Sequence, residues 1–432
     1  MAEALRVAVA GLGTVGAGLV RLLQTQHDVI AARAGRAIEI TAVAARDKGK
    51  DRSCDLGGYA WYENAAEMAR DADADVVVEL IGGSEGIAKE TCEAAFTAGR
   101  HVVTANKALI AHHGLQLAGA AEQAGVTLAY EAAVAGGIPV IKSIREGLAG
   151  NQISSLHGIL NGTCNYILTA MRETGRDFGD VLSEAQALGY AEADPSFDVD
   201  GVDAAHKLAI LTSLAFGVEI DFESVSVEGI RHITPDDLQY AREIGYKIKL
   251  LGIAEQAEHG VFQRVHPVMV PMSAPIASVE GVFNAVVTKG DFVDTTVMEG
   301  RGAGDGPTAS AVAADLIDIA AGRGGPAFGV PVSALRKMPT LPLDSRVGTY
   351  YVRLVVIDQP GVMADITAIL RDESISLENV IQRGRDPGAP VTVVLTTHDA
   401  AEAAMQAACA KIEALGAVVE TPRMIRIELF EE

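Results

Sequence analysis

A glycine pattern near the N-terminus limits what this chain can fold into more than any other feature. Gly11, Gly13 and Gly16 follow the strand-like run LRVAVA, and the apolar residues after them recur at helical spacing. In such a strand, turn and helix, Gly11 permits a tight turn, Gly13 lets a pyrophosphate approach the backbone, and Gly16 lets the helix pack closely on the strand. The pattern predicts a dinucleotide-binding turn, with Thr14 and Val15 starting the helix whose N-terminus faces the phosphates.

The runs beyond this turn predict three α/β parts. Residues 5–137 repeat an apolar β-branched run, a glycine-containing turn and an Ala-rich or amphipathic stretch, which predicts a doubly wound parallel sheet of the Rossmann type. Beyond residue 138, strand-like runs such as NAVVTKGDFVD mix with helix-like stretches such as 202–216, which predicts a second α/β domain with an open sheet. Residues beyond 350 follow the order of a ferredoxin-like βαββαβ unit, which could fold alone.

We therefore expect four segments along the chain. They are a nucleotide-binding domain over residues 1–137, a substrate-binding and dimerisation domain over 138–299, a Gly- and Pro-rich linker over 321–347 and a C-terminal module over 348–432.

Composition excludes several classes of partner. The chain has 35 Lys and Arg against 57 Asp and Glu, and its formal net charge of −22 argues against a nucleic acid or an anionic membrane. The four cysteines form no C-x-x-C pair, and no apolar run approaches the roughly 18 residues of a membrane span. We expect a cytoplasmic protein whose partners are small molecules and other copies of itself, in a homodimer or homotetramer.

The residues after the second predicted strand indicate which nicotinamide dinucleotide is bound. An acidic side chain here accepts a hydrogen bond from the ribose 2′-hydroxyl of NAD, whereas a basic one meets the 2′-phosphate of NADP. Arg46 comes first, with Lys48, Lys50 and Arg52 close behind, so the sequence favours NADP. Asp47 keeps NAD open as an alternative, and a solvated basic loop is another.

Two further places carry candidate chemistry. Lys107 follows the fourth predicted strand, at the sheet edge where open α/β folds bind ligands, although a surface lysine is the plain alternative. The denser site is an acidic stretch ending in a lysine, with members Glu192, Asp194, Asp198, Asp200, Asp203 and Lys207. Asp203 and Lys207 share one face of an otherwise apolar helix. The apolar neighbours would bury the stem of Lys207, and a desolvated lysine has a lowered pKa, so Lys207 can take or give a proton near neutral pH. An exposed ion pair and a loop for a hard cation are the alternatives.

This stretch also carries a resemblance to a known family. The pattern Ala185-x3-Gly189-Tyr190, followed by Asp194-Pro195-x2-Asp198-Val199-x-Gly201-x-Asp203-x3-Lys207, resembles the signature of homoserine dehydrogenases, and every fixed position is filled. Further segments resemble the same family: VELIGG at 78–83, TANK at 104–107, EAAVAGGIP at 131–139, LNGTCNYIL at 160–168 and GRGAGDGPTASAVAAD at 300–315. Because the dinucleotide turn lies so near the N-terminus, we expect the monofunctional form, without an upstream kinase domain.

The resemblance implies reversible, NAD(P)-dependent reduction of L-aspartate 4-semialdehyde to L-homoserine, in the route to threonine, methionine and isoleucine. It implies that Lys207 is the general acid and base, that Asp203 holds this lysine and the hydroxyl region of the substrate, and that Lys107 lies between nicotinamide and substrate. Glu192 would bind the substrate's amino group, with Asp198 in the same substrate site.

The resemblance also implies cofactor and cation contacts. Thr104 and Gly304 would touch the cofactor, so residues from about 300 to 320 would return to the nucleotide-binding domain. A monovalent cation such as Na⁺ would be held by Glu131, Val134, Gly136 and Ile138.

Two alternatives of other classes stay open at this point. One is a phosphorylating semialdehyde dehydrogenase, in which the thiolate of Cys164 would attack the aldehyde with help from His157 or His206. The other is a non-catalytic sensor, in which the nucleotide-binding domain would report the state of the cofactor to the C-terminal module.

A second resemblance concerns the end of the chain. The run VIDQPGVMADI at 356–366 resembles the opening of an ACT domain, in which the turn before the first helix binds an amino acid at a subunit interface. Pro360 pre-sets φ in this turn, and Gly361 lets the backbone approach a ligand. The resemblance implies that an end product, threonine, binds here and lowers activity. A module that only pairs subunits is the alternative.

Overall fold

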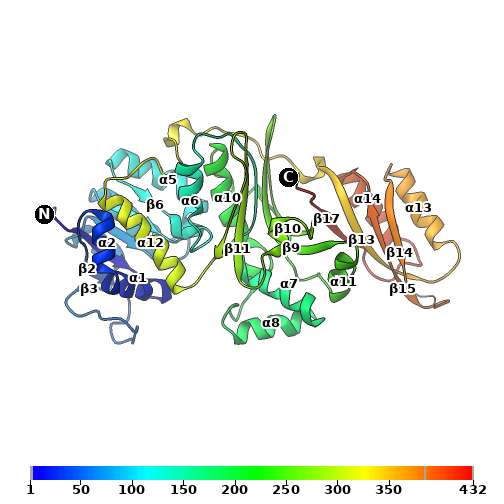
Figure 1. Ribbon diagram of the computed structural model, residues 1–432, viewed down its shortest axis with the longest axis horizontal. Coiled ribbons are helices and arrows are strands. Elements are labelled where there is room, and N and C mark those ends of the chain that lie inside the picture. The colour runs from blue at the N-terminus through cyan, green and yellow to red at the C-terminus, as the bar shows by residue number, and fades with distance from the viewer. Residues whose placement is uncertain (1–2, 384–385, 431–432) are drawn as a thin grey trace.

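The computed structural model describes residues 3–383 and 386–430, which form two sheets with helices packed on them (Figure 1). The first sheet is parallel throughout, in the order β3-β2-β1-β4-β5-β6. Its strands are β1 (Leu5–Ala10), β2 (Ile38–Ala44), β3 (Ala60–Tyr62), β4 (Val76–Glu79), β5 (His101–Thr104) and β6 (Leu128–Ala129). The doubly wound sheet is thus confirmed, with the short β3 as a strand that hydrophobic patterning did not reveal.

Helices cover both faces of this sheet because its strands are apolar on both. Val7 and Val9 of β1 share a core with one helical layer, while Ala8 and Ala10 share a core with Met68 on the other side. The helices are α1 (Thr14–Thr25), α2 (His27–Ala34), α3 (Ala65–Asp71), α4 (Ile87–Thr97), α5 (Lys107–Ala124) and α12 (Asp305–Ala320).

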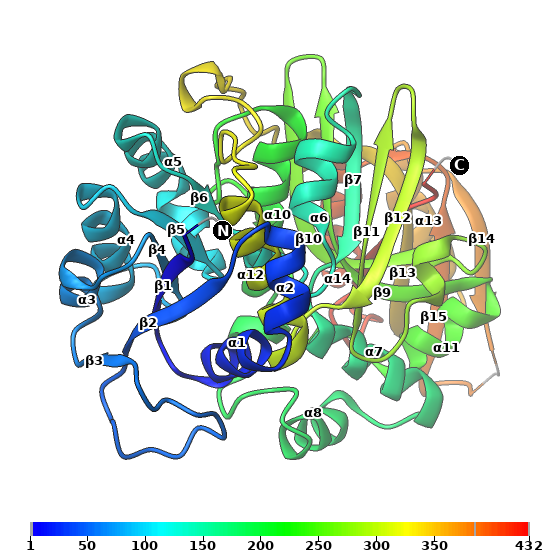
Figure 2. The ribbon, with the colours of Figure 1, turned by 60° about the vertical axis from the view of Figure 1, so that its left-hand side comes forward.

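Helix α12 lies on α1, although the second sheet separates the two in sequence (Figure 2). Arg21 Nη2 is 2.6 Å from Asp305 Oδ2, and a Cβ added to Gly18 would lie 3.0 Å from the carbonyl oxygen of Asp305. This packing supports placing residues 300–320 with the nucleotide-binding domain, while the boundaries drawn from the sequence remain a prediction.

The second sheet runs through the remainder of the chain in the order β12-β11-β7-β9-β10-β17-β13-β15-β14. Its strands are β7 (Ile153–Ile159), β9 (Tyr246–Ala257), β10 (Gly260–Pro271), β11 (Phe283–Gly290), β12 (Asp294–Arg301), β13 (Val347–Ile357), β14 (Leu377–Gln382), β15 (Pro390–Thr397) and β17 (Arg423–Ile427), with β8 (Ser226–Val227) beside β10 and β16 (Ala400–Ala401) beside β13. The run NAVVTKGDFVD, expected to be one strand, is a hairpin instead, because the chain turns after Gly290 and Asp294 begins β12 with a φ of 61°.

Helix α10 (Val202–Phe216) lies between the parallel sheet domain and the second sheet (Figure 1). Nearly all of its side chains are buried, and it packs on α5, β7, β9 and β10. The other helices here are α6 (Val140–Lys142), α7 (Gly162–Thr174), α8 (Phe178–Ala187), α9 (Ser196–Val199) and α11 (Pro235–Glu243), with single turns η1 (Glu131–Ala133), η2 (Ser143–Gly147), η3 (Pro275–Ser278), η4 (Val332–Ala334) and η5 (Leu343–Ser345). The Asp203 and Lys207 side chains on α10 therefore point into protein interior, which argues against an exposed ion pair.

The C-terminal module has the predicted βαββαβ order, with α13 (Val362–Asp372) and α14 (Glu402–Glu413) between its strands. It does not hang separately from the linker, because β17 pairs in parallel with β10, placing Val268 opposite Arg426 and Met269 opposite Ile427. Segment 321–347, predicted as a linker, forms isolated bridges at Arg336 and Thr340 on its way to β13. One sheet therefore passes without a break from the second domain into the module.

Candidate active site

The glycine turn has the geometry that its sequence predicts. Gly11 has a φ of 95°, and a Cβ there would lie 2.5 Å from the carbonyl oxygen of Leu80. A Cβ on Gly16 would overlap the carbonyl oxygen of Gly11, so α1 and the turn can touch only through glycine. Gly13 caps the start of α1, and among the described residues no atom lies within 4 Å of where its Cβ would be. The backbone at Gly13 is therefore open to a ligand.

This turn borders a cavity of about 550 Å³, here called the nucleotide cavity. It is lined by Gly11, Leu12, Gly13, Ala44, Ala45, Arg46, Asp47, Lys50, Arg52, Glu63, Ala65, Leu80, Ile81 and Ile87. The carboxylate of Asp47 accepts a hydrogen bond from the backbone N–H of Gly49 at 2.8 Å, and Arg52 Nε donates to the carbonyl of Leu12 at 3.3 Å. Of the basic residues predicted for the 2′-phosphate site, Arg46, Lys50 and Arg52 are thus in the wall, whereas Lys48 is not and lies over the ring of Trp61.

A second cavity of about 630 Å³, here called the central cavity, brings together residues from the two sheets. Of the predicted site residues, its lining includes Val15, Lys107, Gly136, Glu192, Asp198, Asp203, Lys207 and Gly304. Segments as far apart in the chain as Val15 and Thr308 therefore meet here, with the N-terminal ends of α1 and α12 on one side and α10 on the other.

The polar centre of this cavity is the carboxylate of Asp203. Lys207 Nζ donates to Asp203 Oδ2 and to the carbonyl of Leu160, both at 2.7 Å, while Lys107 Nζ lies 3.0 Å from Asp203 Oδ1. Asn161 Nδ2 donates to Asp203 Oδ2 at 2.9 Å. Burial alone would raise the pKa of Asp203, but the two ammonium groups outweigh it and hold that pKa below its usual range. Burial likewise lowers the pKa of Lys107, and Asp203 reverses this into a net rise.

Two more carboxylates lie toward the other side of the cavity. Asp198 accepts a hydrogen bond from Asn161 Nδ2 at 2.8 Å, and burial, followed by the charge of Asp203, raises the pKa of Asp198. Glu192 is exposed at the rim, and its backbone carbonyl accepts from Gln186 Nε2 at 2.9 Å. The cavity thus carries an ammonium pair at its centre and carboxylates toward the rim, a pattern that suits a small zwitterionic molecule.

Three polar residues that sequence reasoning missed hold this arrangement. Asn161 and Asn106 are the N-caps of α7 and α5, and each side-chain oxygen accepts from a backbone N–H three residues on. Glu79, fully buried, accepts from the hydroxyl of Thr104 at 2.6 Å and from the N–H of Ile81 at 2.7 Å. An asparagine before a helical stretch was a signal for the two caps, whereas nothing local marked Glu79. Thr104, expected to touch the cofactor, lines neither cavity and bonds Glu79 instead.

Glu131, one of the residues expected to hold a cation, is a buried carboxylate that interacts with a second buried carboxylate, Asp315. The carboxylate of Glu131 accepts from the N–H groups of Ile141 at 2.9 Å and Lys142 at 2.8 Å, and its own N–H donates to Asp315 Oδ2 at 2.9 Å. Burial, and then the charge of Asp315, raises the pKa of Glu131 to about 7, while burial raises the pKa of Asp315 to about 6. The carbonyl of Ile138 accepts from the N–H of Val140 at 2.7 Å.

Two sequence alternatives lose their basis in this geometry. Cys164 is buried, its thiol donates to the carbonyl of Asp198 at 3.2 Å, and burial raises its pKa well above the usual value, so it offers no thiolate. The ring of His157 stacks on the ring of Phe430. The Nε2 atom of His206 lies 3.2 Å from the Nε2 atom of His112. Within residues 3–383 and 386–430, no three His, Cys, Asp or Glu side chains are placed to hold a metal ion, which leaves the hard-cation loop without support.

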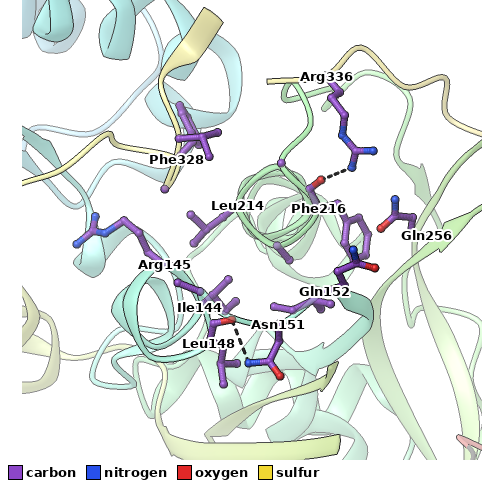
Figure 3. A pocket seen from close by; sticks show the side chains of 16 residues that line it. Ile144, Arg145, Leu148, Asn151, Gln152, Leu214, Phe216, Gln256, Phe328 and Arg336 are labelled. Carbon is purple, nitrogen blue, oxygen red and sulfur yellow. Dashed lines mark hydrogen bonds between the residues drawn. The ribbon is translucent and has the colours of Figure 1, made fainter. Parts of the chain in front are cut away.

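A third cavity, of about 440 Å³, lies at the C-terminal end of α10 (Figure 3). Leu214 and Phe216 line it from α10, and Arg336 donates to the carbonyl of Phe216 at 2.7 Å. None of the predicted catalytic, substrate or cofactor residues lines it. The predicted catalytic and substrate residues line the central cavity instead. Separately, no helix within the described residues is long and apolar enough to cross a membrane.

Comparisons with known proteins agree with this geometry. The family described as homoserine dehydrogenase, NAD binding domain, matches residues 11–131, the family described as homoserine dehydrogenase matches residues 139–317, and the ACT domain family matches residues 350–416. The homoserine dehydrogenase of Pseudomonas aeruginosa is 47% identical over 430 residues, which cover 98% of each chain.

Solved structures extend the likeness to the fold. A homoserine dehydrogenase from Thiobacillus denitrificans superposes with a TM-score of 0.93 at 46% identity, covering 99% of each chain. A hyperthermophilic archaeal homoserine dehydrogenase in complex with NADPH has a TM-score of 0.63 at 26% identity, covering 73% of this chain and 97% of that one. Both the profiles and the full-length identities show that this chain belongs to the homoserine dehydrogenase family.

Proposed function

We propose that this chain catalyses the reversible, NADP-dependent reduction of L-aspartate 4-semialdehyde to L-homoserine, in the biosynthesis of threonine, methionine and isoleucine. The observation that carries the proposal is the ammonium of Lys207, held by Asp203 and Leu160 in a cavity that reaches the N-terminal ends of α1 and α12. Membership in a family of oxidoreductases argues against the non-catalytic sensor.

The residues of the central cavity fit a hydride transfer. The bound dinucleotide supplies or accepts the hydride, and the protein must stabilise the negative charge that develops on the substrate oxygen. Lys207 spends two of its three N–H donors on Asp203 and Leu160, which leaves one for that oxygen. Lys107 adds a second positive charge beside Asp203, so the lysines together hold the oxygen anionic until Lys207 protonates it.

The remaining carboxylates and glycines hold the two ligands. Glu192 and Asp198 supply negative charge for the substrate's ammonium group. Gly13 and the N-terminus of α1 meet the pyrophosphate through backbone N–H groups, with Val15 and Gly304 nearer the nicotinamide.

One assay tests the proposed reaction. We expect homoserine-dependent reduction of NADP⁺, followed by the absorbance of the reduced nicotinamide, with slower reduction of NAD⁺. Adding threonine to parallel reactions tests the regulatory proposal below. No homoserine-dependent reduction of either dinucleotide would contradict the proposed function.

The choice of NADP rests on the wall of the nucleotide cavity. Arg46, Lys50 and Arg52 contribute positive charge there, and of the two carboxylates in the lining, Asp47 and Glu63, Asp47 already accepts a hydrogen bond from the N–H of Gly49 through Oδ1. We predict that Arg46→Ala raises KM for NADP⁺ about tenfold, since one charged hydrogen bond to a phosphate is lost, and leaves KM for NAD⁺ within about twofold. The matched control is Arg33→Ala on the exposed side of α2. Equal changes for both dinucleotides would contradict the assignment.

We also propose that Na⁺ binds at Glu131, with carbonyls of Val134, Gly136 and Ile138. The buried carboxylates of Glu131 and Asp315 repel each other there, and Lys142 compensates them only in part, because its Nζ is 3.5 Å from Asp315 Oδ1 and also pairs with Asp318. A cation fits this surplus of negative charge.

Thermal unfolding tests the cation site. NaCl is expected to raise Tm by about 2–5 °C above tetramethylammonium chloride at equal ionic strength, because a ligand of the folded state stabilises it. Glu131→Gln should remove the difference, whereas Glu67→Gln, at an exposed residue of α3, should keep it. Identical Tm values in the two salts for the wild-type chain would exclude the site.

Regulation and assembly are proposed on the C-terminal module. The turn before α13 contains Gly361 with a φ of 100°, with no described atom beyond its chain neighbours within 4 Å of its Cβ position, so a threonine molecule could approach its backbone.

The outer strands β12 and β14 leave both ends of the second sheet unpaired among the described residues, with Val297 and Val380 exposed. These edges suit assembly into a homodimer or homotetramer. Cytoplasmic location remains a prediction from the sequence.

A further inference from the structure

The wall of the central cavity contains a carboxamide that the proposed mechanism does not use. Asn284 is the second residue of β11, it is 1% exposed, and it lines the cavity. Among the described residues, neither its Nδ2 nor its Oδ1 has a hydrogen-bond partner. Buried polar groups are nearly always bonded, so an unpaired donor and acceptor in the wall of a ligand cavity indicate a ligand group.

The surrounding backbone makes room for this carboxamide and fixes its position. A Cβ on Gly302 would overlap all three atoms of the carboxamide group, and a Cβ on Gly162 would lie 3.3 Å from Oδ1. Gly302 precedes α12, the helix that packs on α1, and Gly162 begins α7, whose N-cap Asn161 bonds Asp198 and Asp203. The side chain of Asn284 therefore lies between the start of α12 and the start of α7. Glycine at both positions is what allows Asn284 to reach the cavity wall.

We propose that Asn284 binds the carboxamide of the nicotinamide ring, as a residue that selects the cofactor's reactive end. A primary amide offers one donor and one acceptor side by side, which matches the two unpaired atoms of Asn284 in a reciprocal pair. The substrate's ammonium and carboxylate are charged, and the cavity already offers carboxylates and the N-terminus of α7 for them. The neutral carboxamide of Asn284 therefore suits the neutral carboxamide of the nicotinamide ring. The inference rests on the proposed function, because it requires a nicotinamide dinucleotide in this cavity.

The test compares two dinucleotides by binding, without turnover. Calorimetric titrations of the full chain would use NADP⁺ and its 3-acetylpyridine analogue, in which a methyl group replaces the amide NH₂ and removes the donor. We expect the wild-type chain to bind NADP⁺ about five- to tenfold more tightly than the analogue, the effect of one net hydrogen bond. Asn284→Leu should bind NADP⁺ about tenfold more weakly and should no longer distinguish the two.

Further variants keep the test decisive. Asn284→Asp preserves the shape of the side chain, keeps an acceptor for the amide NH₂ and removes the Nδ2 donor to the carbonyl group, which both dinucleotides carry. If the leucine variant does not fold, this variant should bind both dinucleotides more weakly and should still prefer NADP⁺. Asn151→Leu is the matched control, since Asn151 lines the third cavity and should leave both dissociation constants unchanged.

Each alternative result overturns the inference. An Asn284→Leu variant that still prefers NADP⁺ by the wild-type ratio, an Asn284→Asp variant that binds both dinucleotides as tightly as the wild type, or a wild-type chain that binds the two equally would exclude amide recognition by Asn284. Unchanged dinucleotide affinity with a raised KM for homoserine would place Asn284 on the substrate. Failure of the wild-type chain to bind NADP⁺ at all would instead contradict the proposed function, so the two failures are distinguishable.

Discussion

Replacing Lys207 with alanine is expected to lower kcat for homoserine oxidation about a thousandfold, while the dissociation constant of NADP⁺ stays within about twofold of wild type. The ammonium of Lys207 keeps one free donor for the reacting oxygen, and its loss leaves an alkoxide to form beside the carboxylate of Asp203. Lys107 remains 3.0 Å from Asp203 and accounts for residual activity.

Lys337→Ala removes a lysine whose side chain is 83% exposed, and it should leave kcat unchanged. Circular dichroism and the NADP⁺ titration would verify that Lys207→Ala is folded, because Asp203 keeps a positive partner in Lys107. Turnover within tenfold of wild type would remove Lys207 from the role of general acid and base.

The second large effect concerns stability, at the junction between the second domain and the C-terminal module. Arg426→Met is expected to lower the free energy of unfolding by about 3–5 kcal/mol, since removing one partner of a buried ion pair leaves an uncompensated charge. The Arg426 side chain is 7% exposed and bonds Glu402, which is fully buried, and its Nη1 lies 2.9 Å from Glu228 Oε2 of the second domain. Denaturant unfolding would measure the loss.

Arg371→Ala is the matched control, because its side chain is 74% exposed in the same module and it should cost little. An Arg426→Met variant as stable as wild type would show that the junction does not depend on this network. The same junction makes whole-module deletion a poor test of regulation. Such a deletion would unpair β10 from β17 and strip Glu428 from Arg264, whose side chain is 1% exposed.

The position of the active site could be predicted in large part from local patterns. The glycine turn specified its own conformation, because Gly11 and Gly16 admit no Cβ beside neighbouring carbonyls. The apolar spacing at 202–216 identified α10 by its bounds and placed Asp203 and Lys207 on one face. The family signature added roles that no periodicity contains, and the geometry brings Lys107, Asp198 and Glu192 around the same cavity.

Other features could not be predicted, because they depend on contacts between distant segments. The strand β3 has only three residues, too few to show an alternating pattern. The turn between β11 and β12 contains the apolar residues Phe292 and Val293, so the sequence there resembles one continuous strand. Glu79 reads as one more residue of a buried strand, and only the fold shows it bonding Thr104. The unpaired carboxamide of Asn284 is visible only where Gly162 and Gly302 approach it.

The sequence by itself therefore determined the three α/β parts, the dinucleotide turn and the helix that carries Asp203 and Lys207, since each follows from residues within about one element's length. Tertiary structure decided the rest. It placed α12 on α1, bonded Lys107 to Asp203, and joined β10 to β17 in a single sheet. Those outcomes depend on which surfaces meet when the whole chain packs, and a pattern of apolar and polar residues along one segment does not specify its partner.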